Sequence, residues 1–295
     1  MPEPSCRLYV VLARRAPIGV IFRRGPTRHV RLIRWNLEDD SFEPGQWLKA
    51  RVYERRCDLS PRGDLLIYFA AKHRPPFGSW TAVSRPPWFT ALALWPKGDC
   101  WGGGGLFKNG RLIQLNHWSC QMTLADGCRL PSSIAVAPLG DRAGCGEDDP
   151  IEGARLVRDG WKLVRPGTLQ AEQHRESLRW RFSLDRLWQK PQPGASRHAL
   201  RMLVRGIGER DGPWYRLDHD VVDADGQIRV YLPGTDWADW DRNGDLLFSR
   251  EGALFRLAAD MIGHGNDFGE QAGRLADFTD MSFEPIAAPG SATHW

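Results

Sequence analysis

The sequence predicts an all-β protein assembled from repeated antiparallel units. Three observations carry this prediction: apolar and polar residues alternate in many short segments, glycine-containing turns separate those segments, and one segment recurs far along the chain. Windows with apolar residues at helical spacing are few. Because alternation with a period of two places every second side chain on the same side, each such segment fits a strand with one buried face.

The clearest strand candidates are four short segments. Residues 178–184 (LRWRFSL) alternate strictly, and residues 30–35 (VRLIRW) show a similar pattern. Residues 65–69 and 228–232 are rich in aromatic and branched aliphatic side chains, which pack well on a pleated surface.

Hairpin turns are predicted where a residue, most often polar, precedes glycine. Glycine supplies the positive φ that tight hairpins require, and Asn or Asp tolerates the neighbouring position. The pairs are Arg62-Gly63, Lys97-Gly98, Asn109-Gly110, Asp126-Gly127, Asp159-Gly160, Asp225-Gly226, Asn243-Gly244 and Glu251-Gly252. So many turns of one kind predict a chain of many short antiparallel strands.

Two internal repeats connect distant parts of the chain. Residues 57–66 (CDLSPRGDLL) align without gaps on residues 238–247 (ADWDRNGDLL), and residues 93–99 are a weaker third copy. The tetrapeptide Ser-Phe-Glu-Pro occurs at 41–44 and again at 282–285, in both cases after an acidic stretch. Repetition of strand and turn units is typical of radial β architectures.

The repeated unit, an apolar residue and Asp followed after four residues by Gly-Asp-Leu-Leu, resembles the blade motif of β-propellers of the TolB-like or broadly WD40-like kind. The resemblance covers about half of the chain. With roughly 20–22 strand candidates and four strands in a blade, we expect five blades, with six or seven as alternatives. We expect residues 1–295 to form a single β-propeller domain whose N- and C-terminal segments close the ring.

Charge and aromatic residues fit this expectation. Residues 1–60 carry 12 basic and 7 acidic side chains, whereas residues 211–295 carry 6 and 16, so the two ends would attract each other. The 14 Trp residues can fill the interfaces between blades, as we expect for Trp47, Trp88 and Trp95 and for Trp101, Trp180, Trp188, Trp237 and Trp240. An exposed Trp would instead mark a binding face or a sugar platform.

The overall composition limits the class of protein and the compartment in which it is expected. A net charge of +4 is too small for an obligate nucleic-acid binder. The apolar run 8–13 ends at Arg14-Arg15, too short to span a membrane and unlike a signal peptide. Six cysteines without a CxxC pair predict reduced, mostly buried thiols. We therefore expect a cytoplasmic protein, and the excess of Arg over Lys, common in GC-rich genomes, favours a bacterial source.

Two motifs suggest metal sites. Asp239–Gly244 matches the first half of a calcium loop, but Arg250 stands where the loop requires Glu, so a hairpin turn fits better. Cys100, His117, Cys120 and Cys128 contain zinc-ligand types without two short-spaced pairs. Scattered thiols fit that spacing better, and whether these four residues bind metal is left open.

Three further patterns bear on catalysis. The run Gly102–Gly105 lacks the Lys-Ser/Thr of a phosphate loop and indicates a bulge or a close approach of the backbone. Gly-x-Ser-x-Gly and His-Glu-x-x-His motifs are absent. The acidic, histidine-containing segments at 219–225 and 258–274 fit solvated turns, and the second is where we would look for a site in a long loop.

Carboxylates and arginines at repeated or clustered positions are further candidates. Asp58 and Asp239 occupy equivalent repeat positions, which favours a structural role. Arg-Gly-Asp at 62–64 belongs to the same turn unit. Arginine clusters could contact phosphates, although acids are interleaved with them. These are Arg14-Arg15, Arg23-Arg24 with Arg28, and Arg55-Arg56.

The sequence thus predicts a well-defined β architecture but contains no specific catalytic or metal-binding motif. We expect no catalytic residue, metal or cofactor, and a non-catalytic interaction platform that binds a protein partner in a bacterial multi-protein system, with a conflict or defence system as one candidate. One alternative is a propeller hydrolase acting on a glycan or small substrate in a central channel. A nucleic-acid-binding subunit is the second alternative, and would present a contiguous arginine face.

Overall fold

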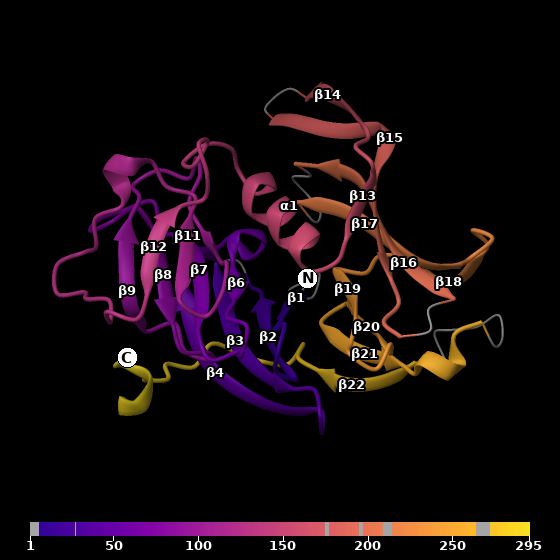
Figure 1. Cartoon of the computed structure of the whole chain (residues 1–295), viewed down its shortest axis with the longest axis horizontal. Helices are drawn as coiled ribbons and strands as arrows, with labels where there is room; N and C mark the ends of the chain where they lie inside the picture. Colours follow the sequence, from indigo (N-terminus) through magenta and orange to yellow (C-terminus); the bar gives the residue numbers. More distant parts are fainter. Residues whose placement is uncertain (1–5, 27, 175–176, 195–196, 209–213, 264–271) are drawn as a thin grey trace. The chain divides into compact units, whose positions relative to one another are not determined.

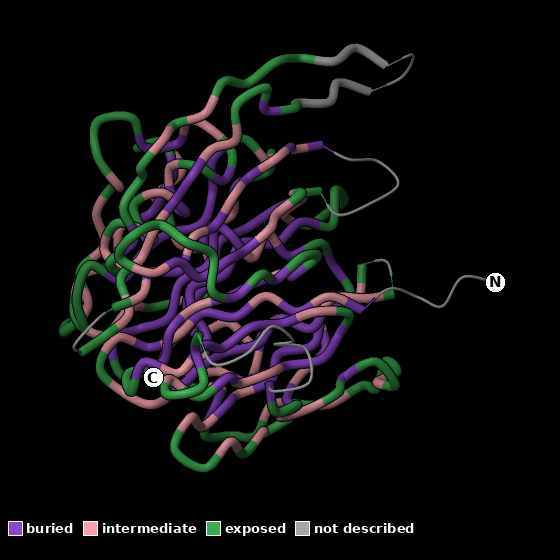
Figure 2. The backbone as a smooth tube through the Cα atoms, turned by 90° about the vertical axis from the view of Figure 1, so that its right-hand side faces the viewer, coloured by how far each residue is buried: buried purple, intermediate pink, exposed green. Residues whose placement is uncertain are grey.

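The computed structural model describes the chain except for residues 1–5, 27, 175–176, 195–196, 209–213 and 264–271. The all-β prediction is confirmed: the described residues form 22 strands in five sheets, with one α-helix, α1 (Asp149–Arg158), and short 3-10 turns. The backbone tube alternates between buried stretches and exposed bends (Figure 2). Among the described residues, none of the helices is long and apolar enough to cross a membrane.

The chain forms two compact units (Figure 1). Unit 1 comprises residues 1–155 together with 280–295, and unit 2 comprises residues 156–279. Three sheets belong to unit 1 and two to unit 2.

The first sheet of unit 1 is a four-stranded antiparallel meander in the order β1-β2-β3-β4. Its strands are β1 (Arg7–Leu12), β2 (Ile18–Arg24), β3 (His29–Asn36) and β4 (Ser41–Lys49). The predicted strand 30–35 is the centre of β3. Val20, Phe22 and Leu32 are fully buried and face the second sheet through one shared core.

The second sheet has both faces covered. It contains β5 (Arg51–Val52), β6 (Asp58–Leu59), β7 (Leu66–Ala71), β8 (Ser79–Ser84) and β9 (Ala91–Pro96). Every residue of β7 and β8 is buried. Leu66 and Tyr68 pack in the core shared with the first sheet, whereas Ile67 packs in a second core with the third sheet. Because successive side chains of a strand point to opposite faces, β7 contributes side chains to both cores.

The third sheet ends with a parallel pair. It consists of β10 (Gly105–Phe107), β11 (Leu112–Leu115) and β12 (Ala135–Pro138). The predicted Asn109-Gly110 turn joins β10 to antiparallel β11, but β12 runs parallel to β11 after a long connection. Asp126-Gly127 lies within that connection and is not a hairpin between paired strands.

Unit 2 contains the fourth and fifth sheets. The fourth is built from β13 (Lys162–Arg165), β14 (Thr168–His174), β15 (Ser177–Pro191), β16 (His198–Ile207), β17 (Tyr215–Asp223) and β18 (Ile228–Leu232). The fifth is a meander of β19 (Trp237–Trp240), β20 (Leu246–Arg250), β21 (Ala253–Leu257) and β22 (Gly273–Asp277). Leu200, Trp240 and Phe248 are among the buried residues of the core between these sheets.

The longer sequence repeat corresponds to equivalent hairpins. Residues 57–66 and 238–247 each form a hairpin that enters an interior strand, β6–β7 in the second sheet and β19–β20 in the fifth. Ser60 Oγ and Asp241 Oδ1 accept backbone N–H groups across the two turns, and Gly63 and Gly244 adopt positive φ. The third copy is not equivalent, because residues 93–99 end the sheet at β9 instead of opening a hairpin.

Two further predicted hairpin turns have different outcomes, the first confirmed and the second not. Glu251 and Gly252 both have positive φ and connect β20 to β21 directly, as a type I′ turn requires. Asp159-Gly160, in contrast, ends helix α1: Gly160 has a φ of 94° and Trp161 N–H donates to the Leu156 carbonyl. The prediction of a hairpin there was wrong. A glycine with positive φ can end a helix as well as form a hairpin turn, so the residue pair alone does not distinguish the two.

Candidate binding site

Three loops of unit 1 meet around the fully buried side chain of Asn116. They are residues 99–104, 116–121 and 143–146. Asn116 Oδ1 accepts the N–H of Gly144 at 2.7 Å, and its Nδ2 donates to the Cys145 carbonyl at 3.1 Å. The backbone of Asn116 exchanges hydrogen bonds with Gly103 and Gly104 at 2.7 and 2.9 Å. The side chain and backbone of Asn116 together therefore join all three loops.

The glycine run is required by close packing. Gly102, Gly103 and Gly104 all have positive φ, and a Cβ on Gly103 would lie 2.3 Å from the Phe69 ring. Their N–H groups donate to Gly146 O, Asn116 O and Thr81 Oγ1, so none of the three is directed at a phosphate. The prediction of a close backbone approach is confirmed.

Two indole rings are exposed on these loops. Trp101 is 55% exposed and Trp118 is 44% exposed, although most described Trp side chains in strands are buried. A Cβ on Gly144 would lie 2.7 Å from the Trp118 ring, and one on Gly102 would lie 2.6 Å from the Gly144 carbonyl oxygen. Both loops that carry an indole therefore pack on Gly144, and the bond from Gly103 N–H to the Asn116 carbonyl joins them directly. The two exposed indoles together are named the Trp101/Trp118 patch. The prediction that Trp101 packs between sheets was wrong.

The other predicted packing tryptophans divide in the same way. Trp88 is half-buried, and the side chain of Trp180 lies outside the described residues. The remaining five are buried: Trp47, Trp95, Trp188, Trp237 and Trp240.

A buried polar pair, Thr81 and His117, lies at the start of the loop that carries Trp118. Thr81 Oγ1 and His117 Nε2 are 2.7 Å apart, and His117 Nδ1 lies 3.0 Å from the Gln121 carbonyl oxygen. Both side chains are fully buried. Burial lowers the pKa of His117 to about 4, so the imidazole is neutral at pH 7. Because both ring nitrogens have protein partners, His117 is not poised as a metal ligand.

This histidine makes acid stability predictable. The pKa of His117 is lower in the folded than in the unfolded chain, so the unfolded chain binds more protons between pH 6.5 and about 4. Folding stability from this group is complete above pH 6.5 and is lost as pH falls towards 4, by about 3 kcal/mol. Urea unfolding at pH 7 and pH 4.5 should show a smaller loss for His117→Gln than for the wild type. Equal losses in both proteins would contradict the assignment.

The predicted zinc residues do not form a metal cluster. Cys120 is exposed, Cys100 and Cys128 are half-buried, and His117 is engaged as described. Among the described residues, no group of three or more His, Cys, Asp or Glu side chains is placed to hold a metal ion. None of the six cysteines, all within the described residues, forms a disulfide, but only Cys6 and Cys57 are buried, so the expectation of mostly buried thiols was wrong.

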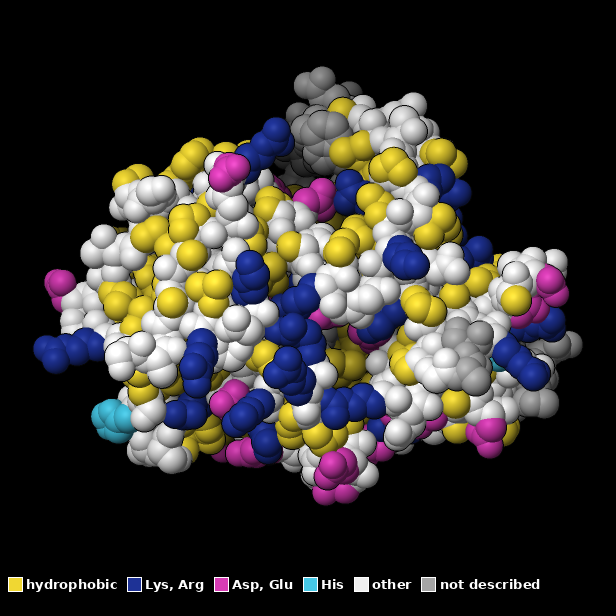
Figure 3. Space-filling view, in the orientation of Figure 1, with side chains coloured by type: hydrophobic (Ala, Val, Ile, Leu, Met, Phe, Trp, Pro, Cys, Tyr) yellow, Lys and Arg dark blue, Asp and Glu magenta, His cyan; other side chains and the backbone are white. Residues whose placement is uncertain are grey.

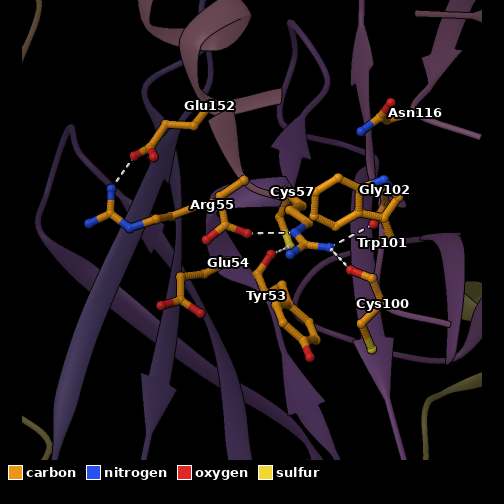
Figure 4. Close-up of polar contacts among 12 residues, drawn as sticks. Tyr53, Glu54, Arg55, Cys57, Cys100, Trp101, Gly102, Asn116 and Glu152 are labelled. Atoms are coloured by element: carbon orange, nitrogen blue, oxygen red, sulfur yellow. Dashed lines mark hydrogen bonds and ion pairs between the residues drawn. The ribbon is translucent and has the colours of Figure 1, made fainter. Parts of the chain in front are cut away.

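A buried ion-pair network fixes the loop that carries Trp101 (Figure 4). Arg56 Nε donates to Asp148 Oδ1 at 2.5 Å, and its Nη1 donates to the carbonyls of Cys100 and Gly102 at 2.7 and 2.6 Å. Arg56 is 1% exposed. Its guanidinium thereby connects the β5–β6 segment to the loop that begins at Cys100.

The second half of the network involves helix α1. Arg55 pairs with Glu152, and Arg155 donates to the Cys57 carbonyl and to Tyr9. Burial raises the pKa of Glu152, while Arg55 and Arg155 oppose that rise. Arg55 and Arg56 form one of the arginine clusters that could have contacted phosphates; both are buried and paired with acids instead. No local pattern reveals this, because the acids lie more than 90 residues away.

The two repeat carboxylates link neighbouring sheets. Asp58 Oδ2 accepts the N–H of Phe107 on β10 at 2.7 Å, and Asp239 Oδ1 pairs with Lys190 Nζ on β15 at 2.6 Å. Burial raises the pKa of Asp239, and Lys190 opposes this. Each carboxylate therefore has a structural partner within its own unit, as the repeat predicted, although the contact reaches an adjacent sheet instead of capping a turn.

The acidic motifs of unit 2 are structural in the same sense. Asp241 caps its turn and pairs with Arg256 at 2.5 Å, which confirms a hairpin in place of a calcium loop. Asp220 pairs with Arg201, and His219 Nδ1 lies 2.7 Å from Thr235 Oγ1. Asp223 accepts the N–H groups of the β17–β18 turn. His264–Asp267, in the loop singled out from the sequence, lies outside the described residues.

No protein-family model matches the chain, and no curated protein matches it. Among solved structures, the chain is similar to an uncharacterized protein from Listeria monocytogenes EGD-e, with 9% sequence identity and a TM-score of 0.30 over 97% of this chain and 86% of that chain.

Proposed function

We propose that this chain is a non-catalytic protein-interaction platform and that the Trp101/Trp118 patch is its principal contact. The observation that carries the proposal is the exposure of two indoles, at 55% and 44%, on loops fixed by a buried hydrogen-bond network. Trp is enriched at the centres of protein interfaces, where a rigid aromatic side chain gains contact area at a small entropic cost. The network removes most of the ordering cost in advance.

The polar groups near the patch favour a protein over a sugar. Sugar platforms combine an aromatic face with polar side chains that hydrogen-bond the hydroxyl groups. Here the side chain of Asn116 and both nitrogens of His117 bond other parts of the chain, and Gln121 Nε2 donates to the Lys97 carbonyl. Except for Gln121 Oε1, which is buried without a hydrogen-bond partner among the described residues, these polar atoms are bonded within the chain, and indoles beside such groups suit a desolvated protein contact.

Exposure of apolar side chains alone does not select the patch. Hydrophobic side chains are scattered among polar ones on the face drawn in Figure 3, and scattered exposure is ordinary for folded proteins. Large exposed side chains also occur in unit 2, including Leu163, Val164 and Ile228. The Trp101/Trp118 patch differs because its two carrier loops are locked together by described hydrogen bonds.

The state of the carboxylates supports a non-catalytic role. A hydrolase in the propeller class needs carboxylates free to contact a substrate. Asp58 and Asp239, the repeat carboxylates, are each bonded to a neighbouring sheet.

We also propose that the five sheets are the blades of a five-bladed β-propeller. The first and fifth sheets are meanders in sequence order, and successive sheets within each unit pack face to face through shared cores. Both features are typical of blades. A crystal structure in which the sheets do not follow one another around a common axis would overturn this.

The cellular setting is part of the proposal. Six cysteines outside disulfides, of which Cys120 is exposed and three others are half-buried, suit a reducing compartment. We therefore propose that the protein works in a bacterial cytoplasm as a subunit of a multi-protein system.

Affinity capture tests the proposed function. A tagged chain should retain a stoichiometric protein partner from a bacterial lysate, and Trp101→Ala/Trp118→Ala should reduce its recovery at least about tenfold, the loss of a single strong hot spot. Trp214→Ala, which removes a comparably exposed indole from unit 2, should leave recovery unchanged.

Two results would contradict the proposal. Undiminished capture by the double variant would exclude the patch as the contact. Recovery that disappears on nuclease treatment would favour the nucleic-acid alternative. Unchanged thermal unfolding of the double variant is the control for folding.

A further inference from the structure

The segment 280–295 folds onto unit 1, although residues 156–279 form a separate unit. Phe283 packs against His29 with ring centroids 5.3 Å apart and against Trp47 at 6.1 Å. Glu284 Oε2 lies 3.9 Å from Arg31 Nη2. These contacts place the second Ser-Phe-Glu-Pro copy on the first sheet.

The first Ser-Phe-Glu-Pro copy makes the same pair of contacts on the same sheet. Phe42 stacks on Trp35 with centroids 5.8 Å apart, and Glu43 lies 3.9 Å from Arg34. In both copies, Phe packs on a Trp of the first sheet and Glu pairs with an Arg of β3. Arg31 and Arg34 thus pair with the Glu of the second and first copy, respectively. The two matching tetrapeptides therefore make matching contacts.

The two copies differ in how they are held. Residues 41–44 begin β4 and are hydrogen-bonded to β3 as part of the sheet. Residues 282–285 form no strand, and Phe283 is 46% exposed. The two copies are therefore not at equivalent positions of two sheets. The second copy is an added segment lying on a finished sheet.

The surface beneath the second copy is organised in advance. The guanidinium groups of Arg23 and Arg31 lie 5.4 and 5.5 Å from the Trp47 ring centroid. Arg31 Nε donates to the Gly45 carbonyl at 3.1 Å, which orients the guanidinium so that Nη2 faces Glu284. With the segment in place, Arg31 and Trp47 are 9% and 6% exposed, whereas the Glu284 side chain is 66% exposed. The receptor side chains are thus covered, while the acidic residue lies at the surface.

We propose that His29, Arg31 and Trp47 form a docking site for peptides with an aromatic residue followed by an acidic one, and that Phe283–Glu284 occupies this site as an internal competitor. The indole takes the aromatic ring and the oriented guanidinium takes the carboxylate. A partner that carries such a segment binds by displacing residues 282–285. This site is distinct from the Trp101/Trp118 patch and does not depend on it.

Peptide binding to the full chain tests this inference. The probe is a fluorescein-labelled peptide of residues 279–288, followed by fluorescence anisotropy. An internal competitor lowers the apparent affinity by the fraction of time the site is free. We therefore expect Phe283→Ala/Glu284→Ala to bind the peptide about tenfold or more tightly than the wild type. Asp280→Ala, in the same segment but outside the motif, should bind as weakly as the wild type.

Variants of the peptide carry the specificity test without altering the receptor. Peptides with Phe283→Ala or Glu284→Lys should not bind the Phe283→Ala/Glu284→Ala protein. Equal binding of the altered and native peptides would overturn the proposal, as would equal affinity of wild-type and double-variant protein for the native peptide.

Discussion

Arg56→Met should destabilise the chain by about 3–5 kcal/mol, because it removes a buried guanidinium that pairs with a buried carboxylate. Asp148 is 7% exposed and lies 2.5 Å from Arg56 Nε. The same substitution removes the donors to the carbonyls of Cys100 and Gly102. Met keeps much of the side-chain volume, so the loss reports charge pairing and hydrogen bonding more than packing.

Urea unfolding followed by circular dichroism measures this effect. Arg62→Met, at an exposed turn position of the same unit, is the matched control and should change the free energy of unfolding by less than about 0.5 kcal/mol. A small effect at Arg56 would mean that water reaches Asp148 and that the network does not fix the loop carrying Trp101.

Gly104→Ala should have the second large effect. Gly104 has a φ of +83°, and an added Cβ would lie 2.3 Å from the Arg56 carbonyl oxygen. A left-handed conformation costs about 1–2 kcal/mol for alanine. Overpacking against backbone adds about 1–3 kcal/mol, so we expect a total of about 2–5 kcal/mol.

Gly98→Ala separates the two contributions. Gly98 has a φ of +87°, but an added Cβ would meet nothing within 4 Å. This variant should therefore lose only the conformational part, about 1–2 kcal/mol. Equal losses at Gly98 and Gly104, measured as the free energy of unfolding in urea, would show that the close approach to Arg56 relaxes freely.

Local patterns predicted the strands well because their physical causes are local. Glu251-Gly252 needs only two residues of positive φ to connect paired strands, and residues 30–35 reveal β3 by alternation. Helix α1 was not predicted from the sequence, because its buried face includes Glu152 and Arg155 beside Ile151. A helix that buries charges has no apolar stripe to detect.

The candidate sites were less predictable for a related reason. Asn116 and Arg56 act on loops remote in sequence, so their partners follow from the tertiary fold and not from spacing. The exposure of Trp101 depends on glycine-enforced loop contacts that composition does not reveal. The Ser-Phe-Glu-Pro repeat was visible in the sequence, but its common use of β3 arginines was not.

The return of residues 280–295 to unit 1 has a consequence for synthesis on the ribosome. Unit 2 is continuous, whereas the contacts of Glu284 with Arg31 and of Trp295 Nε1 with the Arg129 carbonyl join segments separated by all of unit 2. Domains generally fold in order of translation. The sheets of unit 1 therefore emerge and fold with the His29, Arg31 and Trp47 surface uncovered, and each nascent chain passes through an interval in which that surface is open before its own segment arrives.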